Sequence, residues 1–163
     1  MYTKEVMENF MNPSNYGEIE NADGVGKVGN ITCGDVMWLY LKIGKVIGGK
    51  PEDFSDEYIE DIKFKTLGCA AAISTSSMVT RLAKGKTIAE AMRITNKDVM
   101  DSLGGLPAPK IHCSLLAEEA LREALYDYFK KSGRTIPEIL IRNHERAEKT
   151  MCEIAHEHGH TEE

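Results

Sequence analysis

The stretch YIEDIKFKTLGCAAAISTSSMVTRLAKG, residues 58–85, changes its pattern halfway along. In residues 58–67 apolar and polar side chains alternate, which is typical of a strand with one buried face. In residues 70–84 small and apolar residues follow one another without a breaker, which predicts a helix that ends at Gly85. Strand therefore gives way to helix at Cys69, and this switch divides the chain into a strand-rich part and a helical part.

The residues before the switch predict a second strand and a short helix. Residues 36–43 alternate as a strand does, and residues 3–11 place apolar side chains at helical spacing before Pro13. Residues 24–29, GVGKVG, predict a glycine-rich turn, and the acidic run 52–57 predicts a solvated loop.

The residues after the switch predict helices. Residues 87–90 and 135–138 both read Thr-x-x-Glu, the capping box that opens a helix. Between them we expect a helix over 96–103, an extended and rigid proline-containing loop over 105–109, and a long helix over 114–131 that Ser114 caps. Strands first and helices afterwards predict an α+β domain.

The composition is that of a soluble globular protein. The chain has 163 residues, of which 42% are hydrophobic, and a formal net charge of −6 at pH 7. This acidic balance disfavours a nucleic-acid partner, because phosphate backbones bind basic faces. No apolar run approaches the roughly 20 residues that span a bilayer, and the first residues lack the signal-peptide pattern. We expect no membrane partner and a cytoplasmic location.

Two glycine-rich segments match nucleotide-binding motifs only in part. Residues 24–29 fit the dinucleotide fingerprint by their letters, but a strand follows where that fingerprint needs a helix. Residues 44–50 resemble a Walker loop, but Pro51 stands where a Ser or Thr hydroxyl would hold magnesium. Neither segment predicts a nucleotide site.

The four cysteines are too few and too scattered for a disulfide scaffold. Cys69 and Cys113 stand at predicted helix starts, where the helix dipole favours a thiolate. Cys33 stands in a turn before a strand, with Asp35 two residues further on. Such positions are typical of metal ligands, and the alternative is three small buried core residues. Cys152 matches no motif, so we expect it to be an ordinary surface or core residue.

Four segments together resemble the IscU/NifU-type iron-sulfur cluster assembly scaffold. They are residues 12–17 (NPSNYG), 23–35 (DGVGKVGNITCGD), 68–77 (GCAAAISTSS) and 106–119 (LPAPKIHCSLLAEE), and the match covers about residues 2–130. The resemblance implies a small antiparallel sheet in the N-terminal half, packed against several helices, and a helical C-terminal half.

The resemblance also implies a ligand set. Cys33, Cys69 and Cys113 hold a [2Fe-2S] cluster in this set, with Asp35 or His112 as alternatives for the fourth position, and the family's aspartate at the position of Asp35 is associated with cluster lability. Zinc also suits these donors. The separation of Cys69 and Cys113 lacks the extra segment typical of the SufU branch, which favours the IscU branch.

The function implied is a non-enzymatic scaffold. It would build the cluster with sulfur from a cysteine desulfurase of the IscS/NifS type and pass it to apo iron-sulfur acceptor proteins. Cys113 is the expected first acceptor of sulfur, because the helix start and the adjacent basic groups favour its thiolate. The alternative function is a zinc-bound sulfur acceptor that stimulates a desulfurase, as a SufU-like sulfurtransferase does.

The loop before Cys113 is a candidate partner site. Leu-Pro-Ala-Pro-Lys at 106–110 resembles the family's Leu-Pro-Pro-Val-Lys site, which an Hsp70 chaperone reads together with its Hsp40 partner. Leu106, Pro107 and Lys110 are therefore candidate partner-binding residues. Pro109 stands in place of valine, and a rigid loop that presents the neighbouring ligands is the alternative.

The end of the chain is expected to be an addition to the scaffold domain. We assign residues 1–131 to that domain and residues 132–163 to a helical extension with a polar tail. We expect His144 to be a packed residue of the last helix, and His156, His158 and His160 to belong to a frayed tail. A homodimer is a further expectation.

Overall fold

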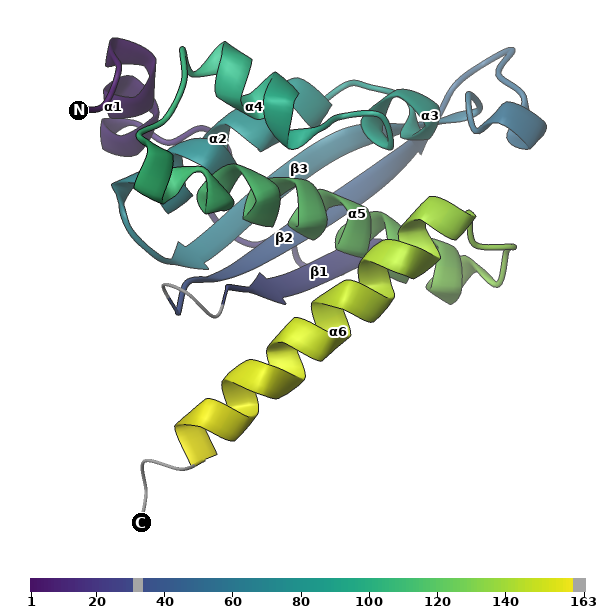
Figure 1. Cartoon of the computed structure of the whole chain (residues 1–163). Coiled ribbons are helices and arrows are strands. Elements are labelled where there is room, and N and C mark those ends of the chain that lie inside the picture. The colour runs from purple at the N-terminus through teal and green to yellow at the C-terminus, as the bar shows by residue number, and fades with distance from the viewer. Residues whose placement is uncertain (31–33, 160–163) are drawn as a thin grey trace.

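The computed structural model describes the backbone of residues 1–30 and 34–159, and the side chains of these residues up to 153. A three-stranded antiparallel sheet has the order β1-β2-β3, and most helices follow it along the chain (Figure 1). The elements are α1 (Lys4–Met11), β1 (Gly24–Gly29), β2 (Val36–Lys45), η1 (Pro51–Asp53), β3 (Glu57–Leu67), α2 (Ala70–Ala83), α3 (Ile88–Ala91), α4 (Asn96–Ser102), η2 (Ala108–Lys110), α5 (His112–Ser132) and α6 (Glu138–Gly159). The expected α+β class, with a small antiparallel sheet and a helical second half, is confirmed.

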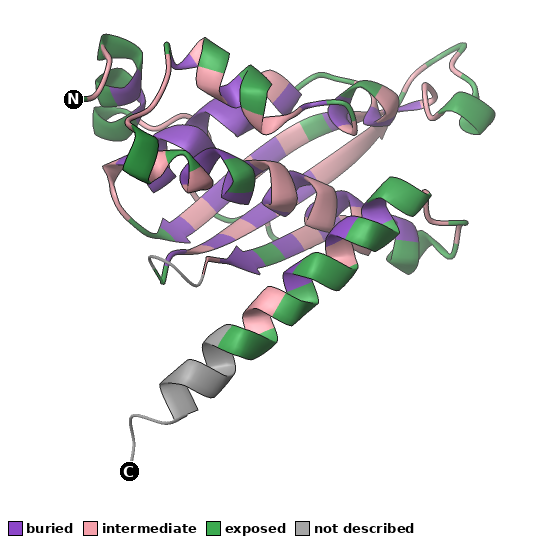
Figure 2. Cartoon of the chain, in the orientation of Figure 1, coloured by how far each residue is buried: buried purple, intermediate pink, exposed green. Residues whose placement is uncertain are grey.

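The sheet buries one face under helices. In β2, Met37, Leu39 and Leu41 are fully buried, whereas the side chains between them are partly exposed (Figure 2). α2 and α5 pack on the buried face and against each other (Figure 1). The alternation in the sequence thus marks which face of the sheet belongs to the core.

The segment 24–29 is a strand, so the expectation of a glycine-rich turn is wrong. β1 pairs with β2 over its whole length, and α5 lies directly across it. A Cβ atom on Gly26 would lie 2.5 Å from the carbonyl oxygen of Ala120 and 2.6 Å from the backbone nitrogen of Ala124. A Cβ on Gly24 would lie 2.3 Å from the carbonyl oxygen of Ala124. The glycines are there because the backbone of α5 comes too close to β1 for any side chain.

α5 begins at His112, two residues before the expected start, so Ser114 is not its cap. The hydroxyl of Ser114 donates to the carbonyl oxygen of Ile111 at 2.7 Å, and Ile111 already has helical backbone angles. The loop expected to be extended ends in the 3-10 turn η2, which leads into the helix. The prolines fix φ near the helical value, so the helix can start without a side-chain cap. Cys113 consequently lies in the first turn of α5.

α6 begins later than its capping box predicts. The first backbone hydrogen bonds of α6 run from Leu140 and Ile141 to the carbonyl oxygen of Pro137, and Glu138 is its first residue. A helix capped by Thr135 would need helical backbone angles at Ile136. Ile136 precedes Pro137, and the residue before a proline is disfavoured in the helical region, so the helix begins later. The boxes at Thr87 and Thr95 are both formed as helix starts.

The acidic run 52–57 is not wholly a solvated loop, because Glu57 belongs to β3 and is 2% exposed. Its carboxylate lies 3.0 Å from Lys45 Nζ and 2.9 Å from a guanidinium nitrogen of Arg134, and it accepts a hydrogen bond from Tyr128. Burial alone would raise the pKa of Glu57, but the hydrogen bonds from Tyr128 and Lys45 and the charge of Arg134 hold it below its usual value. This cluster ties the end of α5 to the sheet.

Among the helices in the described part of the chain, none has both the length and the apolar character needed to cross a bilayer.

Gly26→Ala is expected to lower the free energy of unfolding by about 1–3 kcal/mol, because the added methyl group meets backbone atoms of α5 that cannot rotate away. Urea unfolding followed by circular dichroism measures the loss. Lys27→Ala, one residue along β1 and on the exposed face, is the control and should change stability by less than about 0.5 kcal/mol. Equal stability of the two variants would contradict the close-packing argument.

Candidate metal centre

The candidate ligands come from three places that packing brings to one end of the sheet. Asp35 precedes β2, Cys69 precedes α2, and His112 with Cys113 opens α5. One ligand atom each from Asp35, His112 and Cys113 lie within 4.8 Å of one another. These donors stand far apart in the sequence, so the fold assembles the group.

Asp35 is a buried carboxylate with an unusual environment. Its side chain is 7% exposed, and Oδ2 is buried without a hydrogen-bond partner among the described residues. Leaving a buried carboxylate oxygen without a partner is costly unless a cation or a donor reaches it. Gly68 lies beside the carboxylate, because a Cβ there would lie 3.1 Å from Asp35 Cγ and 2.7 Å from the Cβ of Ala72. The absence of a side chain at position 68 therefore makes room for the carboxylate.

Cys113 and His112 supply a sulfur and a nitrogen donor from adjacent residues. The sulfur of Cys113 lies 3.6 Å from His112 Nε2. Cys113 is fully buried and forms a small apolar cluster with Ala71 and Ala72 of α2. The first turn of a helix carries unpaired amide groups and the positive end of the dipole, which stabilise a thiolate there.

Cys69 stands at the edge of this cluster, at the N-cap of α2. Its side chain makes no capping bond, and Lys110 Nζ lies 3.7 Å from its sulfur. Electrostatic interaction with the neighbouring Cys69, followed by that with Tyr2, raises the pKa of Lys110. Lys110 thus turns its ammonium group toward the sulfur donors.

Tyr2 is a residue of this site that the sequence analysis missed. It packs against the cluster that contains Cys113. α1 follows it and is attached to α2, where the hydroxyl of Ser74 donates to the carbonyl oxygen of Val6 at 2.7 Å. No motif surrounds Tyr2, so only its distance to Lys110 and the cysteines could have revealed it. Gly68 was quoted in a motif, but its role in making space for Asp35 needed coordinates.

Cys33 lies outside the described residues, so its predicted part in the site stays a prediction. Backbone hydrogen bonds join Asn30, before the undescribed residues, to Gly34 and Asp35 after them. Gly34 N donates to Asn30 O at 2.9 Å, and Asn30 N donates to Asp35 O at 2.9 Å. The chain therefore enters and leaves residues 31–33 beside Asp35.

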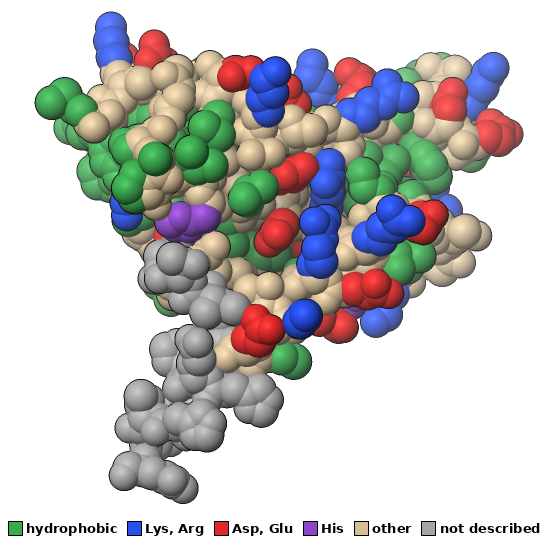
Figure 3. All heavy atoms as spheres, in the orientation of Figure 1, with side chains coloured by type: hydrophobic (Ala, Val, Ile, Leu, Met, Phe, Trp, Pro, Cys, Tyr) green, Lys and Arg blue, Asp and Glu red, His purple; other side chains and the backbone are tan. Residues whose placement is uncertain are grey.

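The surface next to the site is apolar. Hydrophobic side chains gather over α1 and the first turns of α5, whereas charged side chains dominate over α4 and α6 (Figure 3). Ile111 and Leu115 of this surface are 37% and 44% exposed. In the candidate partner loop, Leu106 packs against both core clusters, so its side chain is held by the fold.

The other singled-out residues lie away from this centre. Cys152 is exposed on α6. His144 is packed as expected, since its ring stacks on Tyr126 and its nitrogens lie 2.6 Å from Glu123 and 3.0 Å from Glu148. His160 lies outside the described residues, as do the side chains of His156 and His158.

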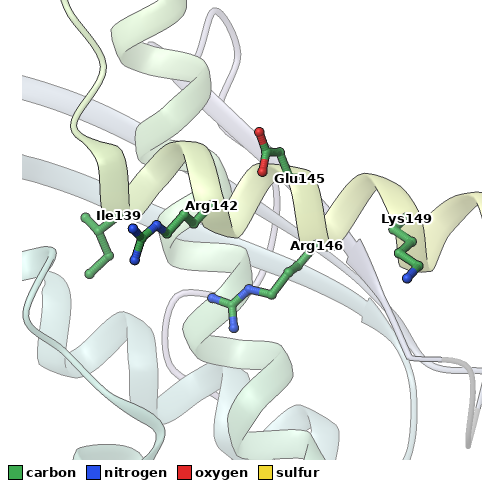
Figure 4. Close-up of a pocket in the computed structure, with 5 residues that line it drawn as sticks. All are labelled: Ile139, Arg142, Glu145, Arg146 and Lys149. Carbon is green, nitrogen blue, oxygen red and sulfur yellow. The ribbon is translucent and has the colours of Figure 1, made fainter.

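A hollow of about 600 Å³ lies along α6, and its lining contains no thiol, imidazole or buried carboxylate (Figure 4). Its lining residues are Ile139, Arg142, Glu145, Arg146 and Lys149. All of them come from a single helix, and the hollow does not compete with the centre at Asp35.

Comparison with known proteins gives one family. Residues 1–135 match the family model of the NifU-like N terminal domain. "Iron-sulfur cluster assembly scaffold protein IscU 1" of Archaeoglobus fulgidus is 55% identical over 134 residues, which cover 82% of this chain and 80% of that protein. "Iron-sulfur cluster assembly scaffold protein IscU" of Aquifex aeolicus is 46% identical over 133 residues, covering 82% and 79% of the two chains.

Solved structures also resemble this one. A nitrogen-fixing NifU-like protein (N-terminal) from Brucella abortus superimposes with a TM-score of 0.61 at 20% identity, covering 79% of this chain and 94% of that chain. A putative iron-sulfur cluster assembly scaffold protein for the SUF system from Fervidobacterium islandicum gives a TM-score of 0.57 at 26% identity, covering 76% and 96%. At 20% identity, the likeness to the Brucella abortus protein concerns the fold alone.

Gly68→Ala is expected to weaken Zn²⁺ binding by about tenfold or more, because the added methyl group crowds Asp35 and moves its carboxylate away from His112 and Cys113. Competition with a chromophoric chelator measures the affinity. Leu67→Ala changes the exposed preceding residue and should leave the affinity within about twofold. Unchanged affinity in Gly68→Ala would exclude Asp35 from the site.

Proposed function

Because the chain belongs to the family of the NifU-like N terminal domain, we propose that it is a scaffold of the IscU type. On it a labile [2Fe-2S] cluster is assembled from iron and desulfurase-derived sulfur and is then passed to apo acceptor proteins. The observation that carries this proposal is the convergence of Asp35, His112 and Cys113 within 4.8 Å, beside Cys69 and Lys110. The protein is an assembly scaffold and not a catalyst in this proposal.

The donor set suits a cargo that must be released. Thiolates of Cys33, Cys69 and Cys113 are soft ligands that match iron and sulfide, whereas the carboxylate of Asp35 is a hard ligand that matches them poorly. His112 offers a second candidate for the fourth position. A centre with one weak metal–ligand bond exchanges that ligand readily and can release the cluster. Four thiolate ligands would hold the cluster more tightly.

Lys110 supports the same chemistry through its charge. Thiolates and a carboxylate gathered in one place repel one another, and the ammonium group 3.7 Å from the sulfur of Cys69 offsets part of this repulsion. Because of this contact, the ammonium group of Lys110 faces the metal centre. A chaperone that binds the loop 106–110 would instead contact it from the solvent side.

The partners that this function needs are part of the proposal. They are a cysteine desulfurase of the IscS/NifS type, apo iron-sulfur acceptors and, through Leu106, Pro107 and Lys110, an Hsp70 with its Hsp40 partner. We also propose a cytoplasmic location, homodimer formation, and the division into a scaffold domain at 1–131 and an extension at 132–163.

A second candidate function is supported by the similarity to the SUF-system protein at 26% identity. Sulfur, nitrogen and oxygen donors also form a tetrahedral zinc site. In this function the same residues hold zinc while the protein accepts sulfur from a desulfurase, and no cluster is built.

Anaerobic incubation with iron, cysteine and a desulfurase tests the main proposal. We expect a coloured protein whose visible and Mössbauer spectra are those of a [2Fe-2S] centre, and which passes the cluster to an apo-ferredoxin. A colourless zinc protein that never transfers a cluster would support the second candidate instead.

Asp35→Ala is expected to slow cluster loss in air about three- to tenfold, because the poorly matched carboxylate is removed from the centre. The decay of the visible absorption measures the rate. Asp101→Ala, an exposed aspartate of α4, removes the same charge away from the site and should decay as the wild type does. Unchanged or faster decay in Asp35→Ala would reject the lability argument.

Sulfur transfer is expected to label Cys113, and mass analysis of the persulfide after incubation with a desulfurase tests this. Because Cys113 is fully buried, the prediction also requires the desulfurase to open the site. Cys152→Ser removes an exposed thiol outside the centre and should leave the labelling intact. Label on Cys33 or Cys69 and never on Cys113 would contradict the prediction.

A further inference from the structure

The face of the sheet opposite α2 and α5 has a composition unlike the rest of the chain. The register places Lys27 opposite Trp38, and Trp38 opposite Lys65, so these side chains share one face. We call this surface the outer sheet face. Its members are Val25, Lys27, Val36, Trp38, Tyr40, Lys42, Asp61, Lys63, Lys65 and Leu67. It carries four lysines and one aspartate in a chain whose formal net charge is −6.

The aromatic rings form the floor of a groove on this face. Trp38, Tyr40 and Tyr16 line a hollow of about 280 Å³ together with Glu18, Lys65, Thr66 and Leu67. The ring of Tyr16 is held edge-on against Phe64 at 5.3 Å between centroids. The groove therefore combines a preformed aromatic floor with a polar rim in which Lys65 and Glu18 offset each other, and the excess positive charge of this face comes from lysines outside the hollow.

Two of the lysines keep their charge available to a partner. Lys65 lies 2.6 Å from Glu18, and Lys42 lies 3.9 Å from Asp23, so these charges are partly offset within the chain. In residues 1–30 and 34–153, no ion pair joins Lys27 or Lys63 to a carboxylate. Lys27 instead stands over the ring of Trp38, with Nζ 5.5 Å from its centroid.

The outer sheet face runs up to the metal centre. Leu67 is 69% exposed at the end of β3 and is followed directly by Gly68 and Cys69. Val36, its register partner in β2, follows Asp35. A protein seated on this face would have its edge beside the proposed cluster ligands.

We propose that the outer sheet face is the docking surface for an acidic protein that receives the cluster. This inference rests on the proposed scaffold function. The negative charge of the remaining surface repels an acidic partner, so attraction is confined to one face, and the encounter is steered into the orientation that brings the acceptor to the centre. Nucleic acid fits less well, because each phosphate needs a cation and two of the four lysines already have carboxylate neighbours.

Trp38 makes the proposal measurable, because it is the single tryptophan of the chain. Its fluorescence is recorded while a tryptophan-free apo-ferredoxin with a net negative charge is added to the full chain. We expect saturable quenching with an affinity that falls about tenfold or more between about 50 and 300 mM salt, as screening predicts for opposite charges.

The test variant is Lys27→Glu/Lys63→Glu, and the control is Lys86→Glu/Lys97→Glu, which changes two exposed lysines off the outer sheet face. Both variants alter the net charge by the same amount. The test variant should weaken binding and slow cluster transfer at least about tenfold, and the control less than about threefold, because only the former charges face the partner.

The binding measurements and the assembly measurement test separate claims. Equal binding by the test and control variants would overturn it, and so would tighter Trp38 quenching by a single-stranded oligonucleotide than by the apo-ferredoxin. Cluster assembly is read separately, from the visible spectrum before any acceptor is added. If the wild type assembles a cluster and the test variant binds the apo-ferredoxin as well as the control does, the inference fails while the scaffold function stands. If the wild type assembles no cluster, the scaffold function fails.

Discussion

The close approach of α5 to β1 is the constraint on which the rest of the structure depends. Backbone atoms of Ala120 and Ala124 occupy the space that side chains at Gly24 and Gly26 would need. Because α5 also carries His112 and Cys113 in its first turn, its distance from the sheet decides where these donors stand relative to Asp35. A methyl group on β1 would thus disturb the centre by displacing a helix, without touching a ligand.

The candidate metal centre combines buried side chains with donor atoms of different chemical hardness. A buried carboxylate oxygen, a buried thiol and an imidazole lie together, and a lysine ammonium stands over the second sulfur. Burial fixes the positions of the carboxylate and the thiol, and in the proposed function the hard oxygen donor leaves one bond to the cluster weak. Such a balance suits an assembly scaffold, which must hold a cluster long enough to build it and then release it.

The two faces of the sheet have different roles. The inner face packs on α2 and α5 and thereby fixes the ligands, so substitutions there act through packing. The outer face carries lysines and aromatic rings up to the edge of the centre. A small sheet can in this way hold a site from one side and receive a partner on the other.

The sequence by itself determined the α+β class, the second and third strands, and the places of Cys69 and Cys113 at helix starts, because these follow from residue periods and from motifs that neighbours along the chain define. It misassigned β1, since glycine usually marks turns, and it placed the starts of α5 and α6 wrongly, since proline geometry overrode the caps. Only the tertiary structure decided that Asp35, His112 and Cys113 meet, that Gly68 clears space for the carboxylate, and that Lys110 and Tyr2 belong to the centre. Contacts between residues distant in the chain depend on how helices seat on the sheet, and local patterns carry no information about that packing.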